Sequence, residues 1–168
     1  IGDEPIFSEY EVTNPATDRS YRVAIRGRDP GENFCTCPDF AVNQLGTCKH
    51  IEAVLHKVSK RRNYRKIKDQ PPPHPFVYLA WDVESAPRIR VHRTPEIPVD
   101  LAKILDDWFD PVGIFKSSLP DDFFRFSDAV GDRADIDLGE DARAHALRLA
   151  ERGLYTTDPN PRDRKSVV

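Results

Sequence analysis

Three cysteines and one histidine within a sixteen-residue stretch are the side chains of this chain best suited to metal chemistry. They form two short pairs, Cys35 with Cys37 and Cys48 with His50, and the sequence holds no other cysteine. Three thiolates and one imidazole supply the four donors that a closed tetrahedral zinc site takes. An odd number of cysteines cannot make a self-contained set of disulfides, which also favours metal binding. We therefore predict one structural zinc ion held by these four residues.

Two other interpretations of the same residues stay open. The thiols could be buried free cysteines beside an incidental histidine, because free cysteine often packs as a small apolar side chain. The metal could also be catalytic, although four protein ligands leave no coordination position for water.

The first ligand pair requires a strand. Alternate residues of a strand point to the same side, so Cys35 and Cys37 can face one ion if they end a strand that Pro38 then stops. Asp39 could accept a hydrogen bond from the second ring N–H of His50, as carboxylates beside zinc-bound histidines do. It could equally cap a turn after Pro38.

The second pair requires a helix. Gly46 and Thr47 predict a turn and a helix N-cap. An apolar stripe at helical spacing follows, made of Ile51, Val54, Leu55 and Val58. Cys48 and His50 then fall in the first turn, where backbone N–H groups without helical partners could stabilise the thiolates.

The residue sequence between and around the ligands is also informative. Between Cys37 and Ile51 the chain reads C-P-D-F-A-V-N-Q-L-G-T-C-K-H-I. Over about residues 7–58 it resembles a SWIM zinc finger, whose pattern is C-x-C, a variable connector and C-x-H. It is similar to the version near the N-terminus of prokaryotic Swi/Snf-type helicase-like ATPases. The resemblance implies zinc ligation by the four residues, but no catalysis, because the sequence has no G-x-x-x-x-G-K-[ST] loop and no paired-acid helicase motif.

The predicted fold class is α+β, and the first section is a zinc-finger domain over residues 1–59. Alternating apolar and polar residues flank a turn between Asn14 and Asp18, which predicts a β-hairpin. A third strand and the helix after Cys48 complete a small zinc-bound unit. It has little apolar surface, so we expect metal binding to supply part of its folding free energy.

A basic and then proline-rich linker is predicted over residues 60–75, and an α+β accessory region over residues 76–168. Two strands, 76–83 and 88–92, are expected to join at Ala86-Pro87. Three helices are expected from the apolar stripe Leu101, Ile104, Leu105 and Trp108, from Phe123, Phe126 and Val130, and from residues 142–152, ended by Gly153.

The basic segment, residues 57–68, has seven cations in twelve residues and no acid. The cations are Lys57, Lys60, Arg61, Arg62, Arg65, Lys66 and Lys68. Such a run can simply complement a helix macrodipole, but seven exceed what capping needs and are typical of contacts to a phosphate backbone. Tyr64 could stack on a base or pack internally. Lys49 could extend the positive surface or offset the charge of the metal site.

The accessory region is acidic, with 18 Asp and Glu against 13 Lys and Arg over residues 74–168. Such a surface repels nucleic acid. It could mate with a basic surface of an ATPase core, or it could keep the helices soluble. Three histidines, His74, His92 and His145, have no neighbours at metal-ligand spacing, and we expect them to be surface or core residues.

Two functions are compatible with these features. The zinc unit and the basic segment could contact DNA non-specifically beside a helicase-like motor domain. Alternatively, exposed apolar residues of the connector, Phe40 and Leu45, could dock on the motor domain or on a protein partner. We do not expect this segment to be an enzyme. We do expect it to be part of a longer chain, since it contains no methionine.

The composition also indicates the cellular compartment that we expect. The net charge is −3, and no apolar run approaches the roughly 18 residues of a membrane span. Clustered thiols favour a reducing compartment. We therefore expect a cytoplasmic prokaryotic protein, with nucleoid association as an option and no membrane partner.

Overall fold

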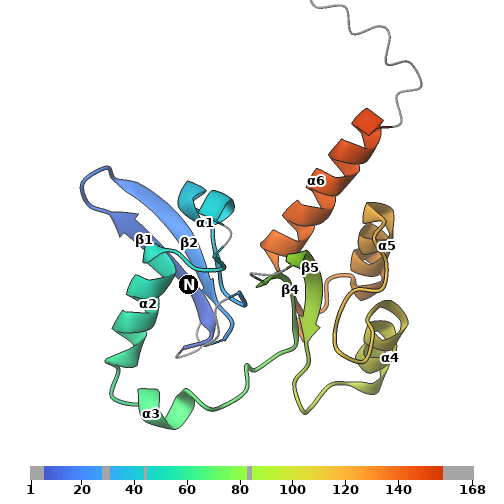
Figure 1. Cartoon of the computed structure of the whole chain (residues 1–168). Coiled ribbons are helices and arrows are strands. Elements are labelled where there is room, and N and C mark those ends of the chain that lie inside the picture. The colour runs from blue at the N-terminus through green and yellow to red at the C-terminus, as the bar shows by residue number, and fades with distance from the viewer. Residues whose placement is uncertain (1–5, 28–30, 44, 83–84, 157–168) are drawn as a thin grey trace, which may run out of the picture.

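The computed structural model describes residues 6–27, 31–43, 45–82 and 85–156. Their helices and strands form two units side by side, each with a three-stranded sheet (Figure 1). The predicted α+β class is confirmed. The elements are β1 Ser8–Asn14, β2 Arg19–Ile25, β3 Phe34–Cys35, α1 Pro38–Asn43, α2 Lys49–Ser59, α3 Tyr64–Ile67, β4 Phe76–Asp82, β5 Ser85–His92, α4 Val99–Trp108, α5 Pro120–Val130, β6 Asp137–Leu138 and α6 Glu140–Thr156.

The first unit, called the zinc-finger unit and comprising the described residues of 6–59, begins with the predicted hairpin. Strands β1 and β2 pair antiparallel from Ser8 with Ile25 to Asn14 with Arg19. Asn14 accepts a hydrogen bond from the backbone N–H of Ala16, and Asp18 has a φ of 51°, a conformation that aspartate tolerates in turns. Asn14 and Asp18 therefore close the turn that the sequence predicts.

Strand β2 separates two packing surfaces because its residues alternate. On one face Val23 and Ile25 join a buried cluster with Ile51, Val54 and Val58 of α2. On the other face Arg22 and Arg26 form ion pairs with residues of α6. The two-residue period of a strand thus sends apolar side chains to α2 and cationic ones to the second unit.

Strand β3 is shorter than predicted. It pairs with β2 only at Phe34 and Cys35, so Cys37 lies beyond the strand. Pro38 ends the extended segment, as predicted, but it also begins the six-residue helix α1, which the sequence analysis missed. Proline suits a first helical position, where its missing N–H has no helical partner to lose.

The second unit, called the accessory unit and comprising the described residues of 76–156, places α4, α5 and α6 around the sheet β5-β4-β6. The predicted helical stripes are confirmed: buried positions include Leu101 and Leu105 in α4 and Phe123, Phe126 and Val130 in α5. Four phenylalanine rings meet at this core, with centroids 5.2–6.1 Å apart for Phe109, Phe115, Phe123 and Phe126.

Two predictions for the accessory unit are wrong in detail, and one strand was missed. Ala86 and Pro87 lie inside β5 and do not connect the strands; Pro87 has no ladder partner, and the register shifts between Ala80 and Asp82. Helix α6 continues through Gly153, which is compatible with a helix interior at a cost of about 1 kcal/mol relative to alanine. The two-residue strand β6, parallel to β4, was not predicted.

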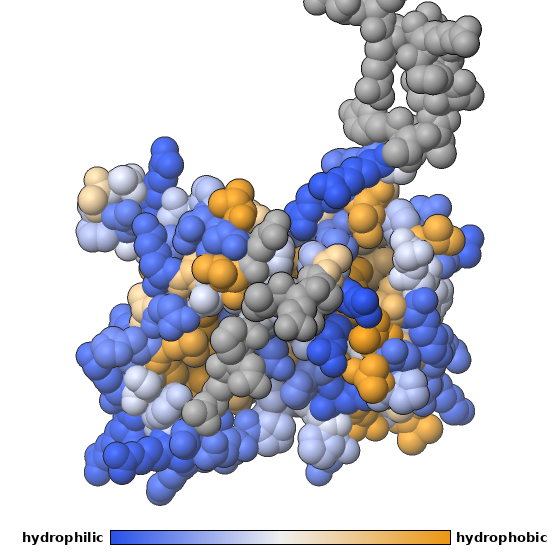
Figure 2. Space-filling model, viewed as in Figure 1, coloured by the Kyte–Doolittle hydropathy of each residue, from blue (hydrophilic) through white to orange (hydrophobic). Residues whose placement is uncertain are grey.

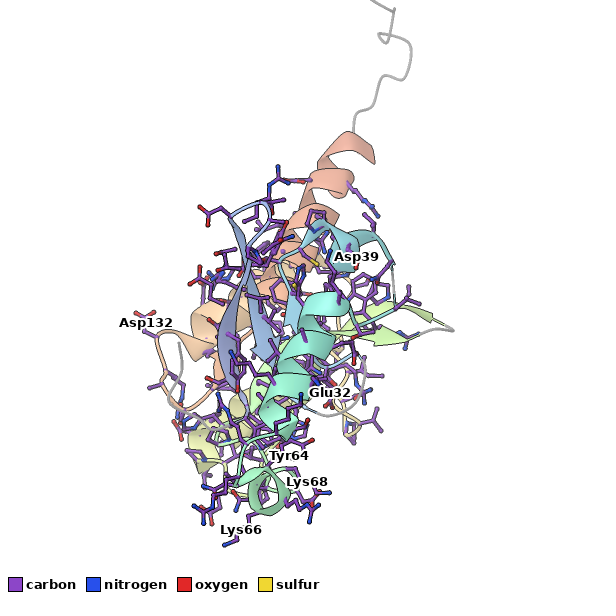
Figure 3. The ribbon with its side chains drawn as sticks, turned by 90° about the vertical axis from the view of Figure 1, so that its left-hand side faces the viewer. Glu32, Asp39, Tyr64, Lys66, Lys68 and Asp132 are labelled. Carbon is purple, nitrogen blue, oxygen red and sulfur yellow. The ribbon has the colours of Figure 1, made fainter. Side chains whose placement is uncertain are left out.

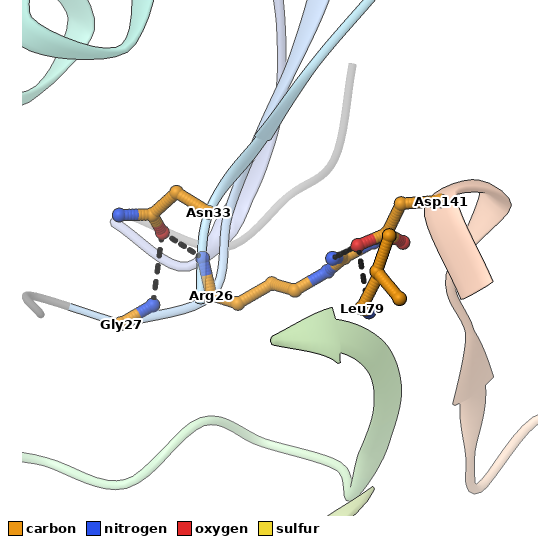
Figure 4. A network of polar contacts seen from close by, with 5 residues as sticks. All are labelled: Arg26, Gly27, Asn33, Leu79 and Asp141. Atoms are coloured by element: carbon orange, nitrogen blue, oxygen red, sulfur yellow. Dashed lines mark hydrogen bonds and ion pairs between the residues drawn. The ribbon is translucent and has the colours of Figure 1, made fainter. Parts of the chain in front are cut away.

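A buried ion pair joins the two units. Arg26 Nη1 and Nη2 donate to the Asp141 carboxylate at 2.8 and 2.9 Å, and the Leu79 N–H donates to it at 3.0 Å (Figure 4). Arg26 and Asp141 are only 7% and 4% exposed. Asn33 fixes the backbone of Arg26 by accepting its N–H at 2.8 Å.

A second contact between the units surrounds Trp81 of β4. The indole lies edge-on to Phe40 of α1, with centroids 6.1 Å apart. Gly31 and Gly46 both have positive φ, and a Cβ on Gly31 would lie 2.6 Å from the Trp81 carbonyl oxygen. Backbone therefore packs directly on backbone here, and the zinc-finger unit is held against the accessory unit.

Candidate metal centre

The structure brings the four predicted ligands together. The thiols of Cys35, Cys37 and Cys48 and a ring nitrogen of His50 all lie within 4.8 Å of one another. All four residues are buried. Cys35 ends β3, Cys37 precedes α1, Cys48 is the N-cap of α2, and His50 lies in the first turn of α2. The end of β3, the residue before α1 and the start of α2 thus converge on one point.

The spacing of these atoms fits a zinc ion. The Nδ1 atom of His50 lies 3.7 Å from the Cys35 sulfur and 4.0 Å from the Cys48 sulfur. In a tetrahedral site with zinc–sulfur bonds of about 2.3 Å, neighbouring ligand atoms are roughly 3.8 Å apart. A small contraction of the group therefore completes the coordination sphere. The Cys₃His group is positioned to bind one zinc ion, and four protein ligands define a closed, structural site.

Backbone amides face the sulfur atoms. The Cys37 N–H donates to the Cys35 sulfur at 3.4 Å, and the Phe40 N–H donates to the Cys37 sulfur at 3.3 Å. Burial raises the pKa of Cys48, and the backbone N–H groups of Ile51 and His50 oppose that larger effect. These donors offset the negative charge of a Cys₃His site, as expected for the start of a helix. The N-cap is Cys48, however, one residue later than the predicted Thr47.

Burial sets the protonation of the ligands. It raises the pKa of the Cys35 and Cys48 thiols above the ordinary value, so a metal must displace protons to bind there. Burial is also the main cause that lowers the pKa of His50, followed by the Lys49 charge. His50 is therefore held as the neutral imidazole that a metal ligand requires.

Asp39 occupies the first turn of α1 with an exposed side chain. Its carboxylate raises the pKa of His50, which opposes the larger effect of burial. No hydrogen bond joins Asp39 to His50 in the described part of the chain. The predicted bond to the histidine ring stays a prediction, and so does the capping alternative.

Two aromatic residues support the site and were not identified from the sequence as doing so. The Tyr21 ring packs on the His50 ring, with centroids 4.7 Å apart. Phe40 is buried, where an exposed docking residue was expected, because it packs between Phe34 and Trp81. The alternation of β2 gave a signal for Tyr21, since it places Tyr21 on the same face as Val23. No local pattern indicated the partner of Phe40.

The basic segment lies at the other end of α2. Figure 3 places Lys66 on α3 and Lys68 at its end, far along the molecule from Asp39 beside the metal centre. Helix α2 has eleven residues, which corresponds to about 16 Å along its axis. Hydrophilic side chains cover α3 and this end of α2 (Figure 2). Lys49 is exposed at the start of α2, whereas Lys57 lies in the last turn of α2 and the other cations follow its end.

The cations of the basic segment differ in their surroundings. Lys57, Lys60, Arg62, Arg65 and Lys66 have exposed side chains. Arg61 lies over the Tyr10 ring, 5.9 Å from its centroid, and Lys68 is half-buried with its Nζ 3.9 Å from the Asp69 carboxylate. Tyr64 is half-buried and packs against the core of the zinc-finger unit.

The acidic accessory unit carries ion pairs of its own. Arg133 pairs with both Asp100 and Asp135, and Arg93 pairs with Asp106. Among the histidines, His92 is half-buried and stacks on Phe76 with an interplanar angle of 3°. The described helices include none that is long and apolar enough to cross a membrane.

Comparison with protein families identifies the site. Residues 21–59 match the family model of the SWIM zinc finger. The match contains all four ligands and runs from β2 to the end of α2, so this segment is similar to SWIM zinc fingers over its whole metal centre. Comparison with curated proteins and with solved structures found no match for the chain.

Proposed function

We propose that the SWIM zinc finger of residues 21–59 and the basic segment that follows it form a non-specific nucleic-acid contact module. The observation that carries the proposal is the exposed cluster of cations at the end of α2 and on α3, with no acid between Ala53 and Lys68. Lysine and arginine that neutralise phosphates release condensed counterions, which makes such binding strong at low salt and independent of sequence.

The role proposed for zinc is structural. Zinc fixes the N-terminal end of α2 against β3, while Ile51, Val54 and Val58 fix the helix on the sheet. The basic segment is attached to the far end of this anchored helix. Its cations are therefore carried by a rigid element, and losing zinc would release that element.

The charges of the zinc-finger unit are separated between its faces. Glu9 and Glu11 alternate along β1 with Tyr10 and Val12, which pack on the α2 side. The two carboxylates therefore point away from α2. Nucleic acid that approaches α2 and α3 meets the cations without facing these acids, which supports the proposed direction of binding.

The same proposal extends to the larger protein. We propose that the module serves a Swi/Snf-type helicase-like ATPase and holds DNA beside the motor domain, in the cytoplasm or at the nucleoid of a prokaryote. The support for this extension is the similarity of the sequence from Cys37 to Ile51 to the corresponding segment of those ATPases. The zinc finger and accessory unit would then contribute binding and positioning, with ATP hydrolysis in the motor domain.

Fluorescence anisotropy with labelled DNA at about 50 and 200 mM salt tests the proposal. The affinity should fall steeply between these two salt concentrations. The loss should be about tenfold or more for every two or three phosphates that the protein contacts. The variant Arg62→Glu, Arg65→Glu, Lys66→Glu should lose binding and keep its zinc and melting temperature. The matched control reverses three exposed cations of the accessory unit, Lys103, Arg125 and Arg148. Equal loss in both variants would contradict a role for the basic segment.

A specific observation favours docking on a protein as the second candidate. Val42 is 75% exposed and Leu45 is 63% exposed, and both belong to the connector between the ligand pairs. Hydrophobic side chains show over α1 in Figure 2. Leu45→Ser should weaken binding to a purified helicase-like motor domain without loss of zinc. Phe40 is buried, so a polar residue there should instead impair folding.

A further inference from the structure

We infer that the basic segment binds the backbone of duplex nucleic acid in preference to unstacked single strands. The inference rests on the proposed function and specifies its partner. It depends on the absence of an aromatic surface beside the cations, on the rigidity of the element that carries them, and on the difference in charge density between the two kinds of nucleic acid.

The aromatic residues near the basic segment are already engaged. Tyr64 packs against the core of the zinc-finger unit. The Tyr10 hydroxyl donates to the Ile6 carbonyl at 2.8 Å, and Arg61 lies over the Tyr10 ring. Among the Phe, Tyr and Trp side chains whose burial the structure describes, none is exposed, and the exposed ring of His56 beside the basic segment is a polar imidazole. The basic segment therefore offers charge without a flat apolar ring.

Single-strand binding depends on such rings. Proteins that bind single strands without sequence preference stack successive bases on aromatic side chains, and each stacked base contributes strongly to affinity. Without stacking, binding is limited to the phosphates. A duplex carries one charge per about 1.7 Å of axis, and it releases more counterions per phosphate contact than a single strand. Cations alone therefore favour the duplex.

The backbone that carries the cations is also held in a fixed arrangement. Helix α2 ends in a hydrogen-bonded turn, where the Arg61 N–H donates to the Val58 carbonyl at 3.0 Å and the Tyr64 N–H donates to the Arg61 carbonyl at 3.0 Å. The Lys68 N–H then closes α3 on the Tyr64 carbonyl at 2.9 Å. A rigid set of charges suits the regular phosphate spacing of a duplex and gains less from a flexible strand.

Competition between two probes tests the inference on the zinc-loaded full chain. The probes are a labelled duplex of roughly 20 base pairs and an oligo-dT strand of the same length, compared at about 50 mM salt. The expected result is a dissociation constant at least about tenfold lower for the duplex. Equal or tighter binding of oligo-dT would overturn the inference and leave the proposed function standing. Binding of neither probe would overturn both.

The variant Tyr64→Leu provides the second test. Leucine keeps an apolar side chain on the core, so zinc content and melting temperature should confirm that the variant is folded. Its affinities for both probes should stay within about twofold of the unaltered chain, because no base stacks on Tyr64. A tenfold loss confined to oligo-dT in the folded variant would identify Tyr64 as a stacking residue and overturn the inference.

Discussion

The zinc-finger unit and the accessory unit share an architecture, a three-stranded sheet with helices packed on it, but they are stabilised differently. The core of the zinc-finger unit includes three thiols, and burial makes two of them resist ionisation. The core of the accessory unit contains four clustered phenylalanines and no thiol, because the sequence has no cysteine there. The first unit therefore depends on a metal, and the second depends on apolar packing. Removing the metal should therefore destabilise the first unit and leave the apolar core of the second intact, and a cavity in that core should leave the metal site intact.

The largest effect is expected from loss of zinc. His50→Ala or a strong chelator should destabilise the zinc-finger unit by more than about 5 kcal/mol, because metal binding is part of its folding free energy. Hydrogen exchange should then be fast in β2 and α2 and still slow in α5. Uniform fast exchange in both units would contradict their separate means of stabilisation.

The reciprocal perturbation lies in the accessory unit. Phe126 is fully buried against Trp108, Phe109, Phe115 and Phe123, so Phe126→Ala should cost about 4 kcal/mol. Urea unfolding followed by circular dichroism gives this value, and metal analysis should still find one zinc per chain. Leu119→Ala, at an exposed position of the same unit, is the control. Zinc loss in the Phe126 variant would show that the two units are not independent.

An intermediate effect is expected where the units meet. Asp141→Asn removes the charge that faces Arg26 in a buried pair, and it should cost about 3 kcal/mol. The exposed pair of Arg22 with Glu140 crosses the same boundary, so Glu140→Gln should cost less than about 1 kcal/mol. Thermal melts of both variants measure the difference. Equal destabilisation would mean that burial does not determine how much each of these two ion pairs contributes to stability.

The smallest effect distinguishes two neighbouring arginines. Arg61→Ala loses the contact with the Tyr10 ring and should cost about 0.5–1 kcal/mol. Arg62→Ala should leave stability unchanged. It should reduce the slope of the logarithm of DNA affinity against the logarithm of salt concentration by about one. Chemical denaturation and anisotropy on both variants provide the comparison. The reverse assignment would mean that the contact of Arg61 with Tyr10 does not support the zinc-finger unit and that Arg62 does not contact DNA.

Local sequence patterns predicted the metal centre and most of the elements. The ligands are two pairs, each separated by one residue, so their convergence needs only a strand end and a helix start. The hairpin around Asn14 and Asp18, and the stripes in α4 and α5, also follow from short-range periodicity. Such features can be derived because each depends on neighbours along the chain.

The features that escaped prediction depend on distant partners. Arg26 and Asp141 are 115 residues apart, and neither residue alone indicates a buried pair. Phe40 is buried because Trp81 of the other unit covers it, although its own segment suggested exposure. Strand β6 has two residues and pairs with β4, too short for any periodic signal. Tertiary packing determined these features, including the position of the zinc-finger unit on the accessory unit.

Native mass spectrometry of the purified chain tests the central claim, a structural zinc site made by Cys35, Cys37, Cys48 and His50. One zinc ion per chain is predicted, and Cys48→Ser should carry none after dialysis against a mild chelator. A Cys48→Ser variant that keeps one tightly bound zinc, or an unaltered chain that binds none, would contradict it.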